Sequence, residues 1–82
     1  MLKKIDVYNK IKALYPDIGE FDKDVFIEFN QGQHAWVVDL KDGQKHLKTY
    51  VEEADAEVCV GRNKCFGVGI QIGQLRDNLK IM

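Results

Sequence analysis

The stretch Ala35-Trp36-Val37-Val38-Asp39-Leu40-Lys41-Asp42-Gly43 decides the fold of this 82-residue chain. It contains the only tryptophan, and its β-branched and aromatic residues are typical of a strand. Asp42-Gly43, at its end, is the strongest short-range hairpin signal that a sequence offers. We therefore predict a strand over residues 34–41 and a turn that leads into a third strand over residues 44–51.

Period-two alternation assigns side chains to the two faces of the sheet. In residues 34–41 we expect Trp36, Val38 and Leu40 on one face and Ala35, Val37 and Asp39 on the other. Residues 25–30 alternate in the same way, with Val25, Ile27 and Phe29 on one side. Residues 55–60 also alternate, which predicts a fourth strand with Val58 and Val60 directed inward.

The two ends of the chain carry helical signals. Residues 3–15 have apolar side chains at three- and four-residue spacing, which predicts an amphipathic helix that ends before Pro16. In the tail, the alternation and glycines of Phe66–Gly73 favour a strand, whereas the spacing of Leu75, Leu79 and Met82 favours a helix. The expected fold class is α+β: an N-terminal helix, then a mainly antiparallel sheet of four to five strands, with a helix or extra strand in the C-terminal tail.

Composition narrows the class of protein. The length predicts a single domain, residues 1–82. A formal net charge of −1 provides no global field for nucleic acid, so we expect no nucleic-acid partner. No run approaches the roughly 20 apolar residues of a membrane span, so we expect no integral membrane association. The basic start lacks the apolar run of a signal peptide, which predicts a cytoplasmic location with Cys59 and Cys65 as reduced thiols.

Catalytic and metal-binding patterns are not recognisable in the sequence. His34, His46, Cys59 and Cys65 lack the close pairs that structural zinc sites use, so we expect no metal site. Nothing in the sequence places a general base beside a nucleophile, and no paired carboxylates stand at recognisable spacing. We therefore expect no catalytic residues, no cofactor and no enzymatic activity.

Three segments, in their order along the chain, resemble the sterol carrier protein type 2 family of non-specific lipid-transfer domains. They are Phe26-Ile27-Glu28-Phe29, the Trp36–Gly43 block and Ala54-Asp55-Ala56-Glu57-Val58-Cys59-Val60, and the similarity spans about residues 5–75. The resemblance implies a sheet covered by helices, with an apolar cavity between them that accepts fatty acids, acyl-CoAs or sterols. The family segment that corresponds to Phe66–Gly73 is helical and rich in Leu and Ala, whereas alternating glycines stand here.

The resemblance leads to a functional hypothesis and leaves one alternative open. The hypothesis is non-enzymatic binding or carrying of a lipid, which is the small apolar ligand expected as partner. The alternative is a protein-interaction or dimerisation module without a small ligand, in which the chain forms a homodimer, because the tail leaves a sheet edge unpaired. The cavity of the lipid carrier should be lined by Val25, Ile27, Phe29, Trp36, Val38, Leu40, Val58, Phe66, Ile70 and Leu75.

Overall fold

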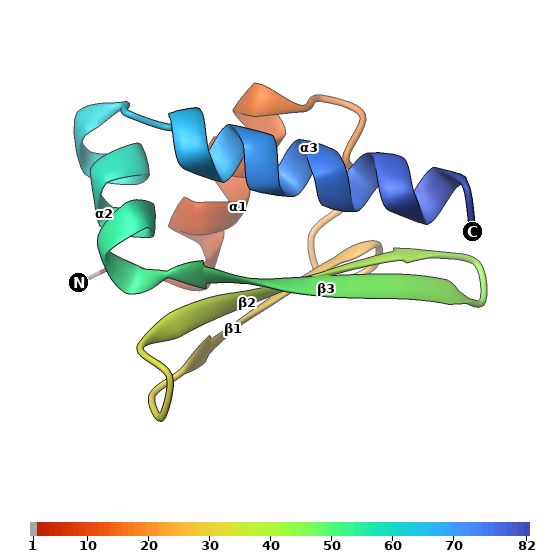
Figure 1. Cartoon of the computed structure of the whole chain (residues 1–82), viewed down its shortest axis with the longest axis horizontal. Helices are drawn as coiled ribbons and strands as arrows, with labels where there is room; N and C mark the ends of the chain where they lie inside the picture. The colour runs from red at the N-terminus through yellow and green to blue at the C-terminus, as the bar shows by residue number, and fades with distance from the viewer. Residues whose placement is uncertain (1) are drawn as a thin grey trace.

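The computed structural model describes residues 2–82 and contains one helix, three strands and two further helices, in that order (Figure 1). This confirms the α+β class and the N-terminal helix. The elements are α1 (Lys4–Leu14), β1 (Val25–Asn30), β2 (Ala35–Asp42), β3 (Lys45–Glu52), α2 (Glu53–Arg62) and α3 (Phe66–Lys80).

The three strands form an antiparallel sheet in the order β1-β2-β3. Trp36 lies opposite Phe29 on β1 and Val51 on β3. Because Asp42 pairs with Lys45, the hairpin loop consists of the two residues Gly43 and Gln44. Gly43 has a φ of 65°, which suits the first central position of a type II′ turn, where glycine is favoured. The predicted hairpin is therefore confirmed.

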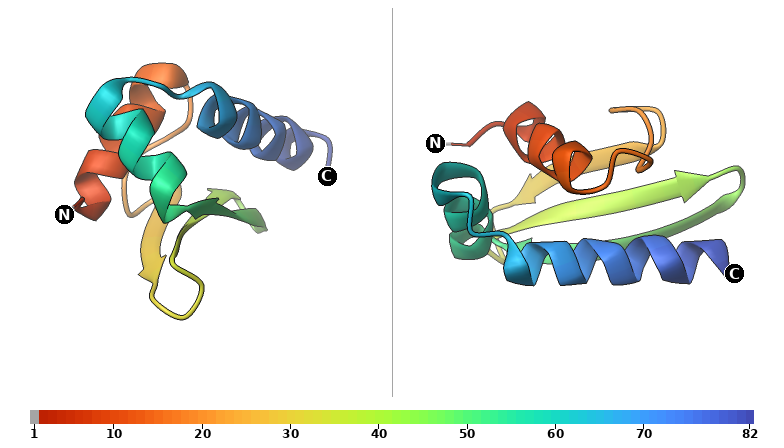
Figure 2. Two further views of the ribbon diagram at one scale, coloured as in Figure 1. Left: turned by 60° about the vertical axis from the view of Figure 1, so that its left-hand side comes forward. Right: turned by 90° about the horizontal axis from the view of Figure 1, so that it is seen from above.

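All three helices lie on the same side of the sheet, as Figure 1 and the left view of Figure 2 show. The buried row of β2 consists of Trp36, Val38 and Leu40, as the alternation predicted, and each is 4% exposed or less. This row lies against α3 and belongs to one core cluster with residues of α1 and α3, of which Ile11 and Ile72 are almost completely buried. The sheet thus has one covered face and one face that no helix of residues 2–82 covers.

The prediction of a fourth strand at residues 55–60 is wrong, because this segment lies in α2. The sheet therefore has three strands instead of four to five. Ala56 and Cys59, three residues apart, are the buried positions, while Val58 is 37% exposed. Alanine and glutamate favour helices, and the acidic first turn complements the helix dipole, so these signals outweigh a short alternation.

The tail is a helix, and its glycines permit a close contact. Val68, Ile72, Leu75 and Leu79 form its buried stripe at three- and four-residue spacing, which is the helical alternative of the two considered. The Tyr15 hydroxyl, just after α1, donates to the Gly69 carbonyl at 2.7 Å. A Cβ atom at Gly73 would collide with that hydroxyl. Glycine at position 73 therefore lets Tyr15 lie directly on α3.

Cys59 and Cys65 form a disulfide, so the prediction of two reduced thiols is wrong. The bond joins the buried side of α2 to the residue that precedes α3. Asn63, in the link, has a φ of 59°, the left-handed conformation that commonly ends a helix. The disulfide thus holds two helices at the point where the chain reverses between them.

Replacing both cysteines, as Cys59→Ala with Cys65→Ala, should lower the free energy of unfolding by about 2 kcal/mol, because a short loop is no longer closed in the unfolded chain. Urea denaturation with and without dithiothreitol measures this. The reductant should destabilise the natural chain to a similar extent and leave the double variant unchanged. Equal stability of the natural chain in both conditions would contradict a stabilising disulfide. Disulfides are rare in cytosolic proteins. The same comparison with and without dithiothreitol, made on the chain in cell extracts, therefore bears on the predicted cytoplasmic location.

Candidate functional site

The ten residues predicted to line a lipid cavity do not share one environment. Phe29 is partly buried, with its ring centroid 5.1 Å from that of Trp36. Phe66 and Ile70 are 84% and 47% exposed, and Val58 also lies at the surface. The remaining six lie in the core: Val25, Ile27, Trp36, Val38, Leu40 and Leu75.

The apolar space beside the core is small in this structure. Its volume is about 10 Å³, close to the least that holds one water molecule. Its walls come from all three helices and from β3, and include Val7, Ile11, Val51 and Val68. An acyl chain would enter only if the helices moved away from the sheet. Lipid carriage therefore stays a prediction.

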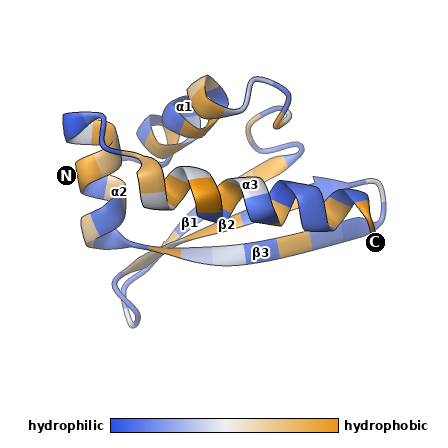
Figure 3. Cartoon of the chain, turned by 45° about the horizontal axis from the view of Figure 1, so that its top comes forward, coloured by the Kyte–Doolittle hydropathy of each residue, from blue (hydrophilic) through white to orange (hydrophobic). Residues whose placement is uncertain are grey.

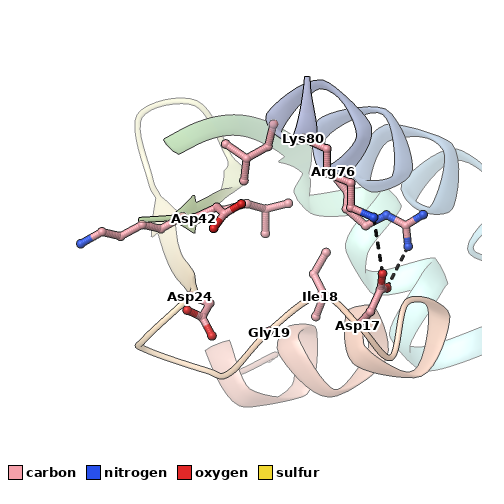
Figure 4. Close-up of a pocket in the computed structure, with 10 residues that line it drawn as sticks. Asp17, Ile18, Gly19, Asp24, Asp42, Arg76 and Lys80 are labelled. Atoms are coloured by element: carbon pink, nitrogen blue, oxygen red, sulfur yellow. Dashed lines mark hydrogen bonds and ion pairs between the residues drawn. The ribbon is translucent and has the colours of Figure 1, made fainter. Parts of the chain in front are cut away.

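A charged cleft of about 330 Å³ opens between the segment after α1, the end of β2 and the end of α3 (Figure 4). Figure 3 shows that this end of α3 is its more hydrophilic half. The floor of the cleft is apolar, and six charged residues surround it: Asp17, Asp24, Lys41, Asp42, Arg76 and Lys80.

Two of the three cations around this cleft, Arg76 and Lys80, form ion pairs within the chain. Arg76 Nη1 lies 2.8 Å from Asp17 Oδ1, and Lys80 Nζ lies 3.7 Å from Asp17 Oδ2. The Arg76 guanidinium also lies 4.7 Å from the centre of the Tyr15 ring. Partial desolvation raises the pKa of Asp17, but the charges of Arg76 and Lys80 outweigh it, so the pKa lies below its usual value. The cluster fastens the segment after α1 to α3.

One acidic side chain of the cleft has a structural role. Asp24 Oδ2 accepts a hydrogen bond from the Glu20 backbone N–H at 3.0 Å, which uses it to shape a turn. Within residues 2–82, no group of three or more His, Cys, Asp or Glu side chains is placed to hold a metal ion. The absence of enzymatic activity stays a prediction.

The outer edge of β3 presents unpaired backbone groups. The Glu53 N–H donates to the His34 carbonyl at 2.9 Å, which is the next pair in the β2–β3 register. Along an antiparallel strand, the N–H and C=O groups of one residue point the same way, and the direction alternates from residue to residue. Odd-numbered residues of β3 therefore bond to β2. The backbone N–H and C=O groups of His46, Lys48 and Tyr50 point away from the sheet, as does the N–H of Glu52, whose carbonyl accepts the first hydrogen bond of α2.

A side-chain contact agrees with this assignment. Gln71 Nε2, from α3, donates to the Tyr50 carbonyl at 2.6 Å and to Thr49 Oγ1 at 2.7 Å. The Tyr50 carbonyl therefore points away from β2, because its hydrogen-bond donor lies outside the β2–β3 pair. One glutamine covers one carbonyl of this edge, and eight residues of strand extend along it.

The edge of β1 is shorter and better covered. Its backbone groups at Val25 bond to the preceding segment, since Val25 N–H donates to Glu20 O at 3.0 Å and Val25 O accepts from Asp22 N–H at 2.9 Å. Near the other end, the Glu28 side chain forms an ion pair with Lys4 of α1 at 2.8 Å, which places α1 beside this strand without covering its backbone groups. Only the β3 edge is long and largely free in the part of the chain that the structure describes.

The uncovered face of the sheet, beside this edge, mixes apolar and charged side chains. Phe26 and Tyr50 are 36% and 40% exposed, and Val37 lies opposite Tyr50 in the register. Asp39 lies opposite Lys48, with His46 Nδ1 at 3.5 Å from Asp39 Oδ1. Of the β3 residues on this face, the sequence drew attention to His46 alone, as a candidate metal ligand, although the weak alternation of residues 44–51 was a signal for the others.

No helix within residues 2–82 is both long enough and apolar enough to span a membrane.

Comparisons with known proteins do not assign the chain to a family. No family model, curated protein or solved structure matches the chain. The resemblance to lipid-transfer domains therefore stays a prediction.

The Asp17 cluster makes a pH-dependent prediction. The folded-state pKa of Asp17 is lowered, so its contribution to stability is present above the pKa of the unfolded chain and is lost as pH falls through the folded value. Asp17→Asn should therefore lower the free energy of unfolding at neutral pH, with no difference from the natural chain in strong acid. Urea denaturation across this range measures it. Glu57→Gln, at an exposed position of α2, is the control, and an equal effect of both variants would contradict the role of Asp17.

Proposed function

We propose that this chain is a non-enzymatic protein-interaction module that binds an extended polypeptide along the free edge of β3. The observation that carries the proposal is the set of outward-directed backbone groups at His46, Lys48, Tyr50 and Glu52. Such a row is a ready template for an added strand, and main-chain hydrogen bonds supply much of the affinity in this mode of recognition.

The surroundings of the edge support this mode of binding. The helices lie on one side of the sheet, so a strand added beside β3 would extend a surface that is free on its other side (Figure 2). Side chains of an added strand would alternate between the two faces. On the uncovered face they would meet Tyr50 and Lys48, both exposed. On the covered side they would meet Leu47 and Thr49, which are partly buried beneath α3.

A synthetic peptide that copies residues 44–53 serves as the probe for strand addition. Titrated into the ¹⁵N-labelled chain, it should slow hydrogen exchange at the amides of Lys48, Tyr50 and Glu52. The amides of Leu47, Thr49 and Val51 should change little, because they already bond to β2. A peptide with proline at the positions of Lys48 and Tyr50 is the control, since it lacks the donors that strand addition needs.

Two outcomes would contradict this proposal. One is fast exchange at Lys48, Tyr50 and Glu52 both with and without the peptide. The other is a saturable change in Trp36 fluorescence on addition of palmitate, with no response of β3 to the peptide, which would favour the lipid carrier instead. We expect palmitate to produce no saturable change up to the high micromolar range, because the apolar space beside the core is only about 10 Å³.

A further inference from the structure

We infer that the occupant of the β3 edge is β3 of a second copy of this chain, paired antiparallel about a two-fold axis at Thr49. The inference rests on the proposed function and names its partner. A continuous six-stranded sheet would result, in the order β1-β2-β3-β3-β2-β1. A two-fold interface of this kind brings the same strand of each copy together, so the strand must be complementary to itself.

The charges of β3 have this self-complementarity. Its first half carries Lys45, His46 and Lys48, and its end carries Glu52 followed by Glu53. Antiparallel self-pairing always places the first half of a strand opposite the second half of its copy. The basic half of each strand therefore lies opposite the acidic end of the other, and opposite charges on directly opposed residues stabilise a sheet. His46 contributes a positive charge to this arrangement when it is protonated.

The register follows from the backbone directions. Residues with free backbone groups must face each other, so His46, Lys48, Tyr50 and Glu52 pair among themselves. With the axis at Thr49, His46 lies opposite Glu52 of the second copy, and Lys48 lies opposite Tyr50. Lys48 Nζ already lies 6.0 Å from the Tyr50 ring centre in its own chain, so the same cation and ring recur across the interface.

The odd-numbered side chains, on the helix-covered side, match in this register as well. Leu47 lies opposite Val51 of the second copy, which is an apolar pair. Thr49 lies opposite its own copy, and threonine pairs are favourable across antiparallel strands. Every position from His46 to Glu52 then has a compatible partner.

Neighbouring registers are worse for specific reasons. An axis at Lys48 places two lysines directly opposite each other, which repel. An axis at Tyr50 places Leu47 opposite Glu53, a charged residue that begins α2 and whose N–H bonds to His34. The Thr49 register avoids both conflicts and, of these three registers, is the one that pairs all four outward-directed residues of the edge with one another.

Gln71 is the group that must move when the strands pair. In the single chain, its Nε2 donates a hydrogen bond to the Tyr50 carbonyl. That carbonyl would instead accept from Lys48 N–H of the second copy, while Gln71 keeps its hydrogen bond to Thr49 Oγ1. The glutamine thus covers the edge when no partner is present, as native proteins commonly do with exposed strands.

Sedimentation velocity of the full chain over a wide concentration range tests the dimer. We expect a reversible monomer–dimer equilibrium. His46→Glu should raise the dimer dissociation constant at least about tenfold, because it places two carboxylates opposite each other twice in the dimer. Glu52→Lys should also raise it, because it removes the carboxylate opposite His46 and places a cation there. An equimolar mixture of the two variants should restore association, since each mixed pair then joins opposite charges. Glu57→Lys, on the exposed side of α2, is the control and should leave the equilibrium unchanged.

Lys48→Pro is a second variant that does not depend on charge. It removes an N–H that faces away from β2, so the ladder of the single chain keeps its bonds while the edge loses a donor. The variant should remain folded by circular dichroism and be monomeric. Association that survives this substitution would overturn the inference, as would failure of the charge variants to restore each other.

The dimer and the proposed function can fail separately. A chain that stays monomeric at all concentrations, yet protects its β3 amides when the peptide binds, overturns the dimer and leaves strand addition standing. A chain that neither associates nor responds to the peptide overturns both.

Discussion

The packing of α3 against the inner face of β2 and β3 is the contact on which the rest of the structure depends. Ile72 and Val38 are fully buried, and Val51 is 1% exposed, so a helix side chain and two neighbouring strands meet without water between them. Burial of such side chains contributes about 1.5–3 kcal/mol each. The contact also determines which side of the sheet faces the helices, and hence which surface of the protein stays free.

The helices cover only one face of the sheet, and this arrangement leaves the β3 edge available for the proposed function. A sheet of three strands offers one central strand and two edges, and here the segment before β1 covers part of the first edge. The chain contains no fourth strand within residues 2–82, because α2 follows β3 directly. The last strand therefore keeps its outward backbone groups, and a single side chain from α3 covers one of them. Binding through this edge needs no cavity and no reactive side chain.

Much of the sheet could be predicted because its signals are local. The alternation of Val25 and Ile27, and of Trp36 and Leu40, distinguishes the buried face over single strands, and all four are buried. Residues 55–60 could not be assigned in the same way, because a short apolar alternation fits two periodicities. In that segment Cys59 is buried and bonded to Cys65. Both features depend on tertiary contacts, which a local sequence pattern does not reveal. An unpaired sheet edge was predicted, but its location on β3 was not, because it depends on which strand lacks a neighbour.

By itself the sequence determined the α+β class, the N-terminal helix, the hairpin after β2 and the buried row of Trp36, Val38 and Leu40, since each follows from spacing within a few residues. Only the tertiary structure decided that α2 and α3 are helices, that two cysteines meet, and that the β3 edge is exposed. These features depend on which distant segments compete for the same apolar surface. A strand forms only where a neighbouring strand can satisfy its backbone, and after β3 the chain buries its apolar side chains as helices instead.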